Sequence, residues 1–187
     1  LTEQKGADLI AAAGAALLDL PAQYVVIGVG AAAIAARLQA LSARAPQRIA
    51  FRAVFDPALA RRLMAAADLL LMPSRFEPCG MTQMYALRYG TLPVVRRTGG
   101  LPDTIIDARP ETLEDGSANG VLFDHADVGG VVYGVRRGLQ LWRDAPVRRA
   151  LQARGMRQAL GWDRAAQAYL RLYADILAQA QDAPHRA

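Results

Sequence analysis

The sequence is poor in cysteine and aromatic residues and has no long apolar run. One cysteine in 187 residues excludes an internal disulfide and a zinc site built from several cysteines, and fits a reducing cytoplasm. An aromatic content of 6% favours closely packed alanine-rich helices over a wide aromatic cleft. The apolar stretches stay below the roughly 18 residues that a membrane span needs, and the chain opens without a signal-peptide pattern. We therefore expect a soluble cytoplasmic protein.

The apolar content predicts one folded domain of ordinary size. With 53% apolar residues, the chain can bury roughly two-thirds of its unfolded surface. We place this domain at residues 1–180 and expect the polar residues 181–187 to form a flexible tail. The chain begins at Leu1, without a helix cap or a strand, which suggests a piece of a longer protein.

The charge and the histidines give no strong sign of nucleic-acid or metal binding. The net charge is +5, but most arginines are scattered along predicted helices with few aromatic residues between them, as on a solvated surface. Nucleic-acid binding remains an alternative, which predicts affinity for any duplex that falls steeply with salt. His125 and His185 lie too far apart for a local ligand pair, so we expect no metal site.

Strand and helix patterns alternate through the first two-thirds of the chain. Apolar or β-branched runs predict buried strands at 24–27, 48–55, 69–72, 91–95 and 121–123. Helical periodicity lies between them, the segment 107–120 reads as an exposed loop, and helices are predicted at about 128–142, 146–160 and 162–179. Repeated strand–helix units predict an α/β fold with parallel strands and right-handed crossovers.

The strand-to-helix turn after residues 69–72 carries the candidate chemistry. Glu77 lies in this turn at the carboxyl end of the strand, the edge where open parallel sheets bind ligands. Pro78 restrains the turn and Gly80 allows close approach of the main chain. The N–H groups of Gly80, Met81 and Thr82 would form an anion site at the start of the next helix. The alternative is that Glu77 only caps that helix.

Other segments contribute candidate residues. Lys5 precedes the first helix and is either solvated or, if its loop faces the same edge as Glu77, neutralises a diphosphate. A second glycine-rich turn, Arg96 to Gly100, is also expected to be lined for anions. We assign the Gly28–Gly30 turn a structural role, because a lone Gly-x-Gly is a weak dinucleotide signal. Phe55 either packs in the core or offers a flat face to a nucleobase.

Several motifs together resemble those of bacterial glycogen synthases and plant starch synthases. They are Leu1–Gly6, Ser74–Gly80, Thr82–Gln83, Tyr85–Ala86, Arg88–Gly90, Pro93–Leu101, Asp103–Thr104, and Trp162 with Tyr169, Leu172 and Tyr173. The resemblance implies a GT-B fold of two Rossmann-like domains, of which this chain is similar to the C-terminal, donor-binding one. This half has a parallel sheet with helices on both faces, followed by C-terminal helices. The N-terminal acceptor-binding domain has no counterpart here.

The resemblance also implies an activity. Such enzymes transfer glucose from ADP-glucose to the non-reducing end of an α-1,4-glucan, with retention of configuration and without a cofactor. By this resemblance Lys5 contacts the donor diphosphate, although the family's companion arginine, just before the position of Leu1, is missing. Glu77 contacts the donor sugar and supports the positive charge that develops on it. We favour an electrostatic role for Glu77 because the turn holds no second acidic residue, and Tyr85 stands where wider retaining GT-B enzymes have a second glutamate.

The remaining roles fall on the turn and on one aromatic ring. Cys79, Gly80, Met81 and Thr82 match the turn whose main chain holds sugar hydroxyls and phosphate. Phe55 stands where the family commonly has a tyrosine stacked near adenine, so the ring is kept and a hydroxyl is lost. An alternative function is a non-catalytic module that binds a nucleotide or nucleotide sugar and has lost the reaction.

Overall fold

The computed structural model describes residues 1–182, which fall into two units by their internal contacts. Unit 1 comprises Leu1–Arg157, and unit 2 begins at Gln158. The domain expected at residues 1–180 therefore spans both units. Of the predicted tail at 181–187, residues 183–187 lie outside the described residues.

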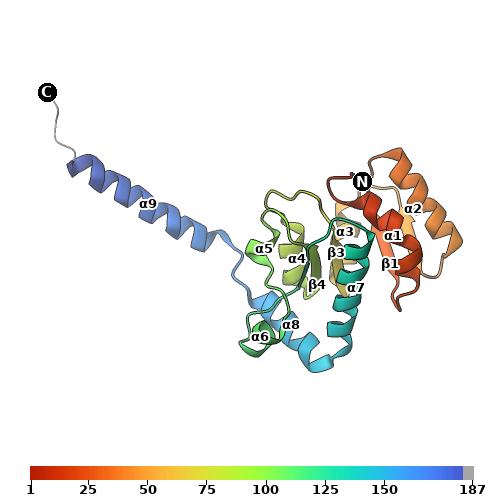
Figure 1. The fold of residues 1–187 in the computed structure, drawn as a ribbon. Helices are drawn as coiled ribbons and strands as arrows, with labels where there is room; N and C mark the ends of the chain where they lie inside the picture. Colours follow the sequence, from red (N-terminus) through yellow and green to blue (C-terminus); the bar gives the residue numbers. More distant parts are fainter. Residues whose placement is uncertain (183–187) are drawn as a thin grey trace. The chain divides into compact units, whose positions relative to one another are not determined.

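Unit 1 alternates strands and helices much as the sequence predicts (Figure 1). Its elements are α1 (Ala7–Leu18), β1 (Tyr24–Ile27), α2 (Ala32–Arg44), β2 (Ile49–Arg52), α3 (Pro57–Ala66), β3 (Leu69–Met72), α4 (Thr82–Tyr89), β4 (Leu92–Arg96), α5 (Leu101–Thr104), α6 (Pro110–Glu114), β5 (Val121–Phe123), α7 (Val128–Arg143) and α8 (Ala145–Arg157). Unit 2 contains the helix α9 (Trp162–Asp182).

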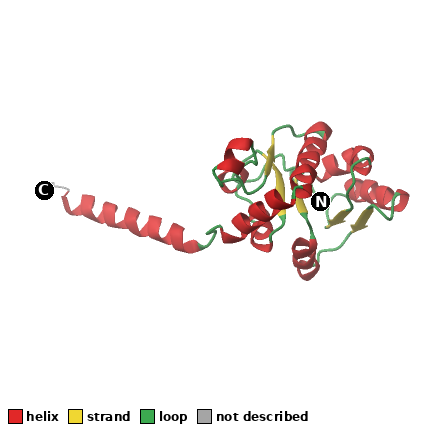
Figure 2. Ribbon diagram, turned by 90° about the horizontal axis from the view of Figure 1, so that it is seen from below, coloured by secondary structure: helices red, strands yellow, loops and turns green. Residues whose placement is uncertain are grey.

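The strands of unit 1 form two parallel sheets with helices packed around them (Figure 2). In one sheet β1 pairs with β2, with Tyr24 opposite Ile49. In the other the order is β3-β4-β5, and Val94 of β4 lies opposite Val121. Every one of these pairs is parallel, so the predicted α/β class is confirmed, although the strands divide into two sheets.

The core of unit 1 lies between the three-stranded sheet and its helices. Val94, Val121 and Phe123 are fully buried together, and α7 packs against both β4 and β5. The other face of α7 meets α1, where Leu17 and Val131 are buried. These contacts pack α1 onto the layer formed by α7 and the three-stranded sheet.

Helix ends follow the sequence signals closely. Asp56 caps α3 by accepting a hydrogen bond from the N–H of Leu59 at 2.9 Å, with Pro57 in the first turn. Gly90 ends α4 in a left-handed conformation, as expected for a glycine cap. Helix α5 is short and ends at Thr104. The cause is visible at Ile106, whose N–H donates to Oδ1 of Asn119 at 2.7 Å instead of continuing the helix.

Two predictions about burial are wrong. The strand Tyr24–Ile27 was expected to be buried, but Val25 is 56% exposed because β1 has a strand neighbour on one side only. The segment 107–120 was expected to be an exposed loop; its middle, including residues 109–111, is exposed, but it contains α6, and Asp107 and Asn119 near its two ends are buried. The Asp107 carboxylate accepts a hydrogen bond from the N–H of Leu122 and pairs with Arg137 at 2.9 Å, so a polar sequence is buried through ion pairing.

Helix α9 of unit 2 is amphipathic, and it exposes a set of large apolar side chains. They are Trp162, Tyr169, Leu170, Leu172, Tyr173, Ile176 and Leu177. The rings of Tyr169 and Tyr173 lie one helical turn apart with centroids 6.2 Å from each other. Within residues 1–182, neither α9 nor another helix is long and apolar enough to cross a membrane.

Candidate active site

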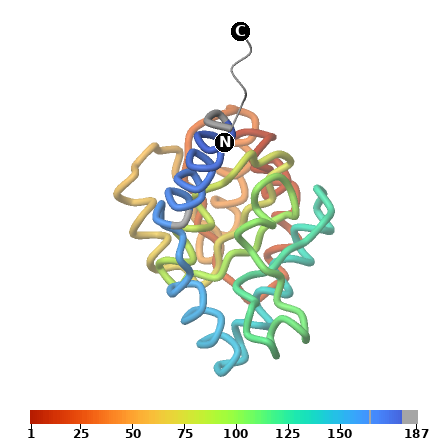
Figure 3. The backbone as a smooth tube through the Cα atoms, turned by 90° about the vertical axis from the view of Figure 1, so that its left-hand side faces the viewer, coloured from red at the N-terminus to blue at the C-terminus, as the bar shows by residue number. Residues whose placement is uncertain are grey.

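The carboxyl end of β3 brings together two predicted site residues that are 72 positions apart. Nζ of Lys5 lies 2.6 Å from Oε2 of Glu77, and the hydroxyl of Ser74 donates to the same oxygen at 3.3 Å. Glu77 is only 4% exposed, whereas the Lys5 side chain is about half exposed. A buried carboxylate requires a paired charge, and Lys5 provides it from the solvent side. In Figure 3 the red N-terminal segment meets the yellow-green segment that follows β3.

The start of α4 lies directly after Glu77 and has no side-chain cap. Gly80 adopts the left-handed conformation at φ 75°, which turns the main chain from the strand end into the helix. No hydrogen bond among the described residues satisfies the N–H groups of Gly80, Met81 and Thr82, and these three residues are at least partly exposed. Unsatisfied N–H groups at a helix start carry a partial positive charge and attract anions. The three N–H groups that the sequence named are therefore unpaired in the fold, and their binding of an anion stays a prediction.

The buried side chain of Gln83 stabilises this turn through hydrogen bonds. Its side chain is fully buried, and its Nε2 donates to the carbonyl of Gly80 at 2.7 Å and to the hydroxyl of Thr104 at 3.0 Å. Its Oε1 has no hydrogen-bond partner within residues 1–182. The amide thus links the turn after β3 to α5, which limits the movement of the N–H groups in front of it.

The second glycine-rich turn supports the first one instead of forming an anion site of its own. The N–H of Gly100 donates to the carbonyl of Glu77 at 3.0 Å. A Cβ atom on Gly99 would lie 1.8 Å from that carbonyl oxygen, and one on Gly100 would lie 2.8 Å from Cα of Cys79. The two glycines are therefore required for close contact between two backbones, and the expectation that this turn is lined for anions is corrected.

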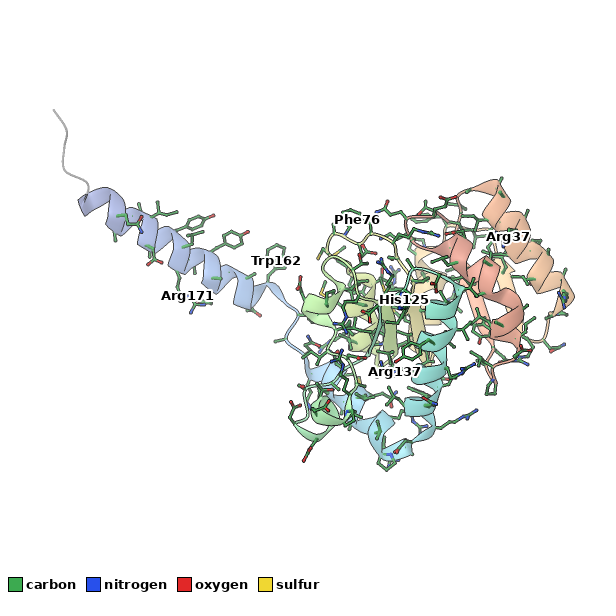
Figure 4. The ribbon with its side chains drawn as sticks, viewed as in Figure 1. Arg37, Phe76, His125, Arg137, Trp162 and Arg171 are labelled. Carbon is green, nitrogen blue, oxygen red and sulfur yellow. The ribbon has the colours of Figure 1, made fainter. Side chains whose placement is uncertain are left out.

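The other predicted site residues are exposed. Cys79 and Thr82 lie on the open side of the turn, and the Cys79 thiol is free. Phe55 follows β2 in the two-stranded sheet and is 82% exposed, so it is not a core residue. The ring of Phe76 beside Glu77 is also more than half exposed and stands at the upper edge of unit 1 in Figure 4.

The Gly28–Gly30 turn has the structural role that the sequence suggested. The carbonyl of Leu1 accepts a hydrogen bond from the N–H of Ala31 at 2.9 Å, and a Cβ on Gly30 would meet the Leu1 backbone. The N-terminal segment therefore packs on the loop that follows β1 before it reaches Lys5. This contact places the segment at the carboxyl edge of both sheets.

Sequence reasoning missed the ion pair that joins α1 to the turn after β3. The guanidinium of Arg75 binds both carboxylate oxygens of Asp8, with Nη1 and Nη2 each 2.7 Å from its oxygen. This hydrogen bonding holds the pKa of Asp8 below its ordinary value, against the opposing effect of burial, and raises the pKa of Arg75. The two residues are 67 positions apart, and no local pattern connects them.

The site combines a carboxylate, an ammonium group and free N–H donors at one strand end. Donors arranged in this way stabilise negative charge, and the carboxylate stabilises positive charge beside it. Such a site suits a reaction that separates charge, for example the cleavage of a bond between a sugar and a phosphate. In the part of the chain that the structure describes, no three His, Cys, Asp or Glu side chains are placed to hold a metal ion.

Comparison with known proteins gives a consistent picture. The family model for glycosyl transferases group 1 matches residues 1–140. The chain is 44% identical over 177 residues to a glycogen synthase of Edwardsiella ictaluri, and 46% identical over 178 residues to one of Leptothrix cholodnii. These alignments cover 95% of this chain but only 37% and 36% of the two relatives. The chain therefore spans little more than a third of the length of the curated relatives it matches.

Solved structures agree with the sequence matches. The catalytic domain of starch synthase IV from Arabidopsis thaliana, bound to ADP and acarbose, superposes with a TM-score of 0.82 and 32% identity, over 94% of this chain and 36% of that one. A sucrose-phosphate synthase from Thermosynechococcus elongatus, at 24% identity and a TM-score of 0.67 over 95% of this chain and 44% of that one, shares the fold. These neighbours are GT-B glycosyltransferases, so the expected fold class is confirmed.

Proposed function

This chain belongs to the glycosyl transferases group 1 family, and we propose that it is the donor-binding and catalytic domain of a glycogen synthase. In this proposal the complete synthase, of which this chain is one domain, transfers glucose from ADP-glucose to the non-reducing end of an α-1,4-glucan with retention of configuration. The observation that carries the proposal is the 2.6 Å ion pair between Lys5 and Glu77 beside the open start of α4. The similarity to glycogen synthases and to an ADP-bound starch synthase supports it.

The diphosphate of the donor binds at the start of α4. The N–H groups of Gly80, Met81 and Thr82 are free to donate to phosphate oxygens, and we expect the ammonium of Lys5, which contacts Glu77, to reach the same phosphates. An ammonium has three N–H donors, so Lys5 can keep Glu77 while it donates to phosphate. As the glycosidic bond breaks, negative charge grows on the departing diphosphate. One preorganised donor of this kind is worth about 3–4 kcal/mol in the transition state.

Glu77 faces the glucose of the donor. Both of its hydrogen bonds end on Oε2, and no described residue donates to Oε1, which leaves that oxygen for a sugar hydroxyl. The carboxylate then lies beside the anomeric carbon as positive charge develops there. The polar partners of Glu77 among the described residues are a lysine and a serine, not a second carboxylate of the kind that retaining hydrolases use. This supports an electrostatic role for Glu77.

Adenine stacks on the exposed ring of Phe55. The ring follows β2 at the carboxyl edge of the two-stranded sheet, where its face is open to a planar base. Stacking of a base on an aromatic ring contributes about 1–3 kcal/mol. Phenylalanine supplies this stacking without the hydroxyl of a tyrosine. The contact is therefore apolar and adds affinity for any purine or pyrimidine base, with no direct hydrogen bond.

The glucan acceptor binds to a domain outside this chain. The chain spans little more than a third of its glycogen synthase relatives, and the site described above provides groups for a nucleotide sugar. We therefore propose that a separate acceptor-binding domain completes the cleft. The chain alone should bind ADP and ADP-glucose and transfer no glucose to glucan.

Binding and transfer assays test the proposal. Isothermal titration of this chain with ADP and ADP-glucose should give saturable binding, with AMP as the control that lacks the second phosphate. Transfer of labelled glucose to glucan should then appear in a full-length polypeptide that carries this chain, and should be lost with Glu77→Gln but retained with Glu111→Gln, an exposed control in α6. Binding of ADP with no transfer in the full-length polypeptide would instead favour the non-catalytic nucleotide-binding module. Failure to bind either nucleotide would refute both functions.

A further inference from the structure

Lys5 and Glu77 come from separate segments, so their contact depends on how those segments are held together. Lys5 lies in the loop of residues 2–6 before α1, and Glu77 lies in the turn after β3. The contact itself is a single ion pair with a half-exposed lysine. Such a pair does not by itself fix two backbones, because the flexible lysine side chain can follow many positions of its loop.

Arg75 binds the Lys5 loop at both of its ends. Its backbone N–H donates to the carbonyl of Gln4 at 2.8 Å, and its Nη1 donates to the carbonyl of Glu3 at 2.6 Å. Its guanidinium also donates one hydrogen bond to each carboxylate oxygen of Asp8, in the first turn of α1. These contacts lie on either side of Lys5 along the chain. The guanidinium of Arg75 therefore links residues before and after Lys5 to the turn that carries Glu77, and its backbone N–H adds a contact that a substitution of the side chain leaves in place.

The backbone carbonyl of Arg75 also contacts the second glycine-rich turn, Arg96 to Gly100. Its carbonyl accepts hydrogen bonds from Nη1 of Arg96 at 3.0 Å and from the hydroxyl of Thr98 at 3.3 Å. Arg96 in turn donates to the carbonyl of Asp124 after β5. Arg75 thus connects the start of α1 to the carboxyl ends of β4 and β5 as well as β3.

From these contacts we propose that Arg75 and Asp8 form a positioning pair that sets the place of Lys5 relative to Glu77, and so controls affinity for the donor diphosphate. Neither side chain is required to touch the donor. This inference rests on the proposed function, because it assumes that Lys5 binds the diphosphate. It adds two residues that act through Lys5.

The geometry of the pair favours positioning over general stabilisation. The side chains are 37% and 23% exposed, and an ion pair that is this exposed adds little to the stability of a fold. The two parallel hydrogen bonds, however, define a direction as well as a distance, which a lysine in place of Arg75 cannot reproduce. The expected result of Arg75→Lys is thus a misplaced loop in a folded protein.

The test compares this pair with a second ion pair in the same chain. Arg137 and Asp107 lie 2.9 Å apart and are more deeply buried, with side chains 20% and 9% exposed. Figure 4 shows Arg137 on α7, well apart from the loop that carries Phe76 next to Arg75. Arg75→Lys and Asp8→Asn are made beside Arg137→Lys and Asp107→Asn, and each variant is measured for its Tm and for its Kd for ADP.

We expect substitutions in the Arg75–Asp8 pair to change mainly the Kd for ADP, and substitutions in the Arg137–Asp107 pair to change mainly the Tm. Arg75→Lys and Asp8→Asn should raise the Kd for ADP by about tenfold or more with a small change in Tm, and the double variant should be no weaker than the single ones. The control variants should lower Tm more than Arg75→Lys and Asp8→Asn do, and should leave the Kd for ADP within about twofold of wild type. A Kd that is unchanged in the Arg75 and Asp8 variants, or that changes only as Tm does in the controls, would overturn the inference.

A double-mutant cycle between Lys5 and Arg75 shows whether Arg75 affects ADP binding through Lys5 or independently of it. If the pair acts through Lys5, then adding Arg75→Lys to a Lys5→Met variant should not raise the Kd for ADP further. A full additional loss in that background would show that Arg75 acts independently of Lys5, and would contradict the inference while the proposed function stands. Absence of ADP binding by the wild-type chain would overturn both.

Discussion

Replacement of Gly6 by alanine should damage both the stability of the fold and the binding of ADP. Gly6 has φ 70°, a left-handed conformation that L-residues other than glycine rarely adopt. An added Cβ would lie 2.2 Å from the carbonyl oxygen of Pro73 and 2.8 Å from its carbonyl carbon. These are backbone atoms at the end of β3, which cannot move aside as a flexible side chain would. The Lys5 loop must therefore shift away from β3.

The expected magnitude follows from these two effects. The left-handed conformation costs about 1–2 kcal/mol for an alanine, and with the steric displacement we expect the free energy of unfolding to fall by about 2–4 kcal/mol. A domain of this size has about 5–15 kcal/mol of stability, so the variant should still fold. A displacement of about 1 Å in a positioning segment is enough to weaken function by about 100-fold in enzymes, so the Kd for ADP should rise at least tenfold.

The assay pairs urea unfolding with titration of ADP, and Gly129→Ala serves as the control. Gly129 lies in the first turn of α7, and the nearest atom to an added Cβ there is Oδ1 of Asp127 at 3.3 Å. Alanine at this position should change the free energy of unfolding by less than about 1 kcal/mol and leave the Kd for ADP unchanged. If Gly6→Ala were as stable as Gly129→Ala and bound ADP normally, the contact between the Lys5 loop and β3 would not be what holds the site together.

Three further predictions concern single side chains. Glu77→Gln in a full-length polypeptide should lower kcat about 100-fold or more with a small change in the Kd for ADP-glucose, and equal losses in both would make Glu77 a binding residue only. Phe55→Ala should weaken ADP binding by about 1–3 kcal/mol while Phe55→Tyr binds at least as well as wild type; an unchanged Kd in Phe55→Ala would place adenine elsewhere. Because Arg75 lowers the pKa of Asp8, the pair stabilises the fold above the ordinary pKa of aspartate and loses this effect as the pH falls through the lowered value. Urea unfolding should therefore show Asp8→Asn to be slightly less stable than wild type at neutral pH and equal to it in strong acid, and a difference that persists in acid would contradict this assignment.

Much of the fold follows from local patterns in the sequence. The strand at 69–72 is a short apolar run between a helix and a proline, and Asp56 with Pro57 and Gly90 mark helix ends through backbone rules that act within a few residues. Glu77 could be placed at the carboxyl edge because it follows a strand of a parallel sheet, whereas the sequence predicts a role for Lys5 beside it only if the loop before the first helix faces the same edge.

The residues that support the site could not be predicted in this way. Arg75 and Asp8 look like ordinary surface charges, and only the folded chain places them 2.7 Å apart. Gly99 reads as a phosphate-binding residue because glycine serves both anion binding and close backbone contact, and the sequence does not distinguish these uses. Asp107 reads as part of an exposed loop because the arginine that pairs with it, Arg137, lies 30 residues away on α7.

The most direct test of the central claim is a crystal structure of this chain with ADP. The account predicts that the diphosphate accepts hydrogen bonds from the N–H groups of Gly80, Met81 and Thr82 and from Nζ of Lys5, with Glu77 beside the terminal phosphate of ADP. ADP bound at a different edge of the sheets, with Lys5 still paired to Glu77 and the start of α4 free of phosphate, would contradict it.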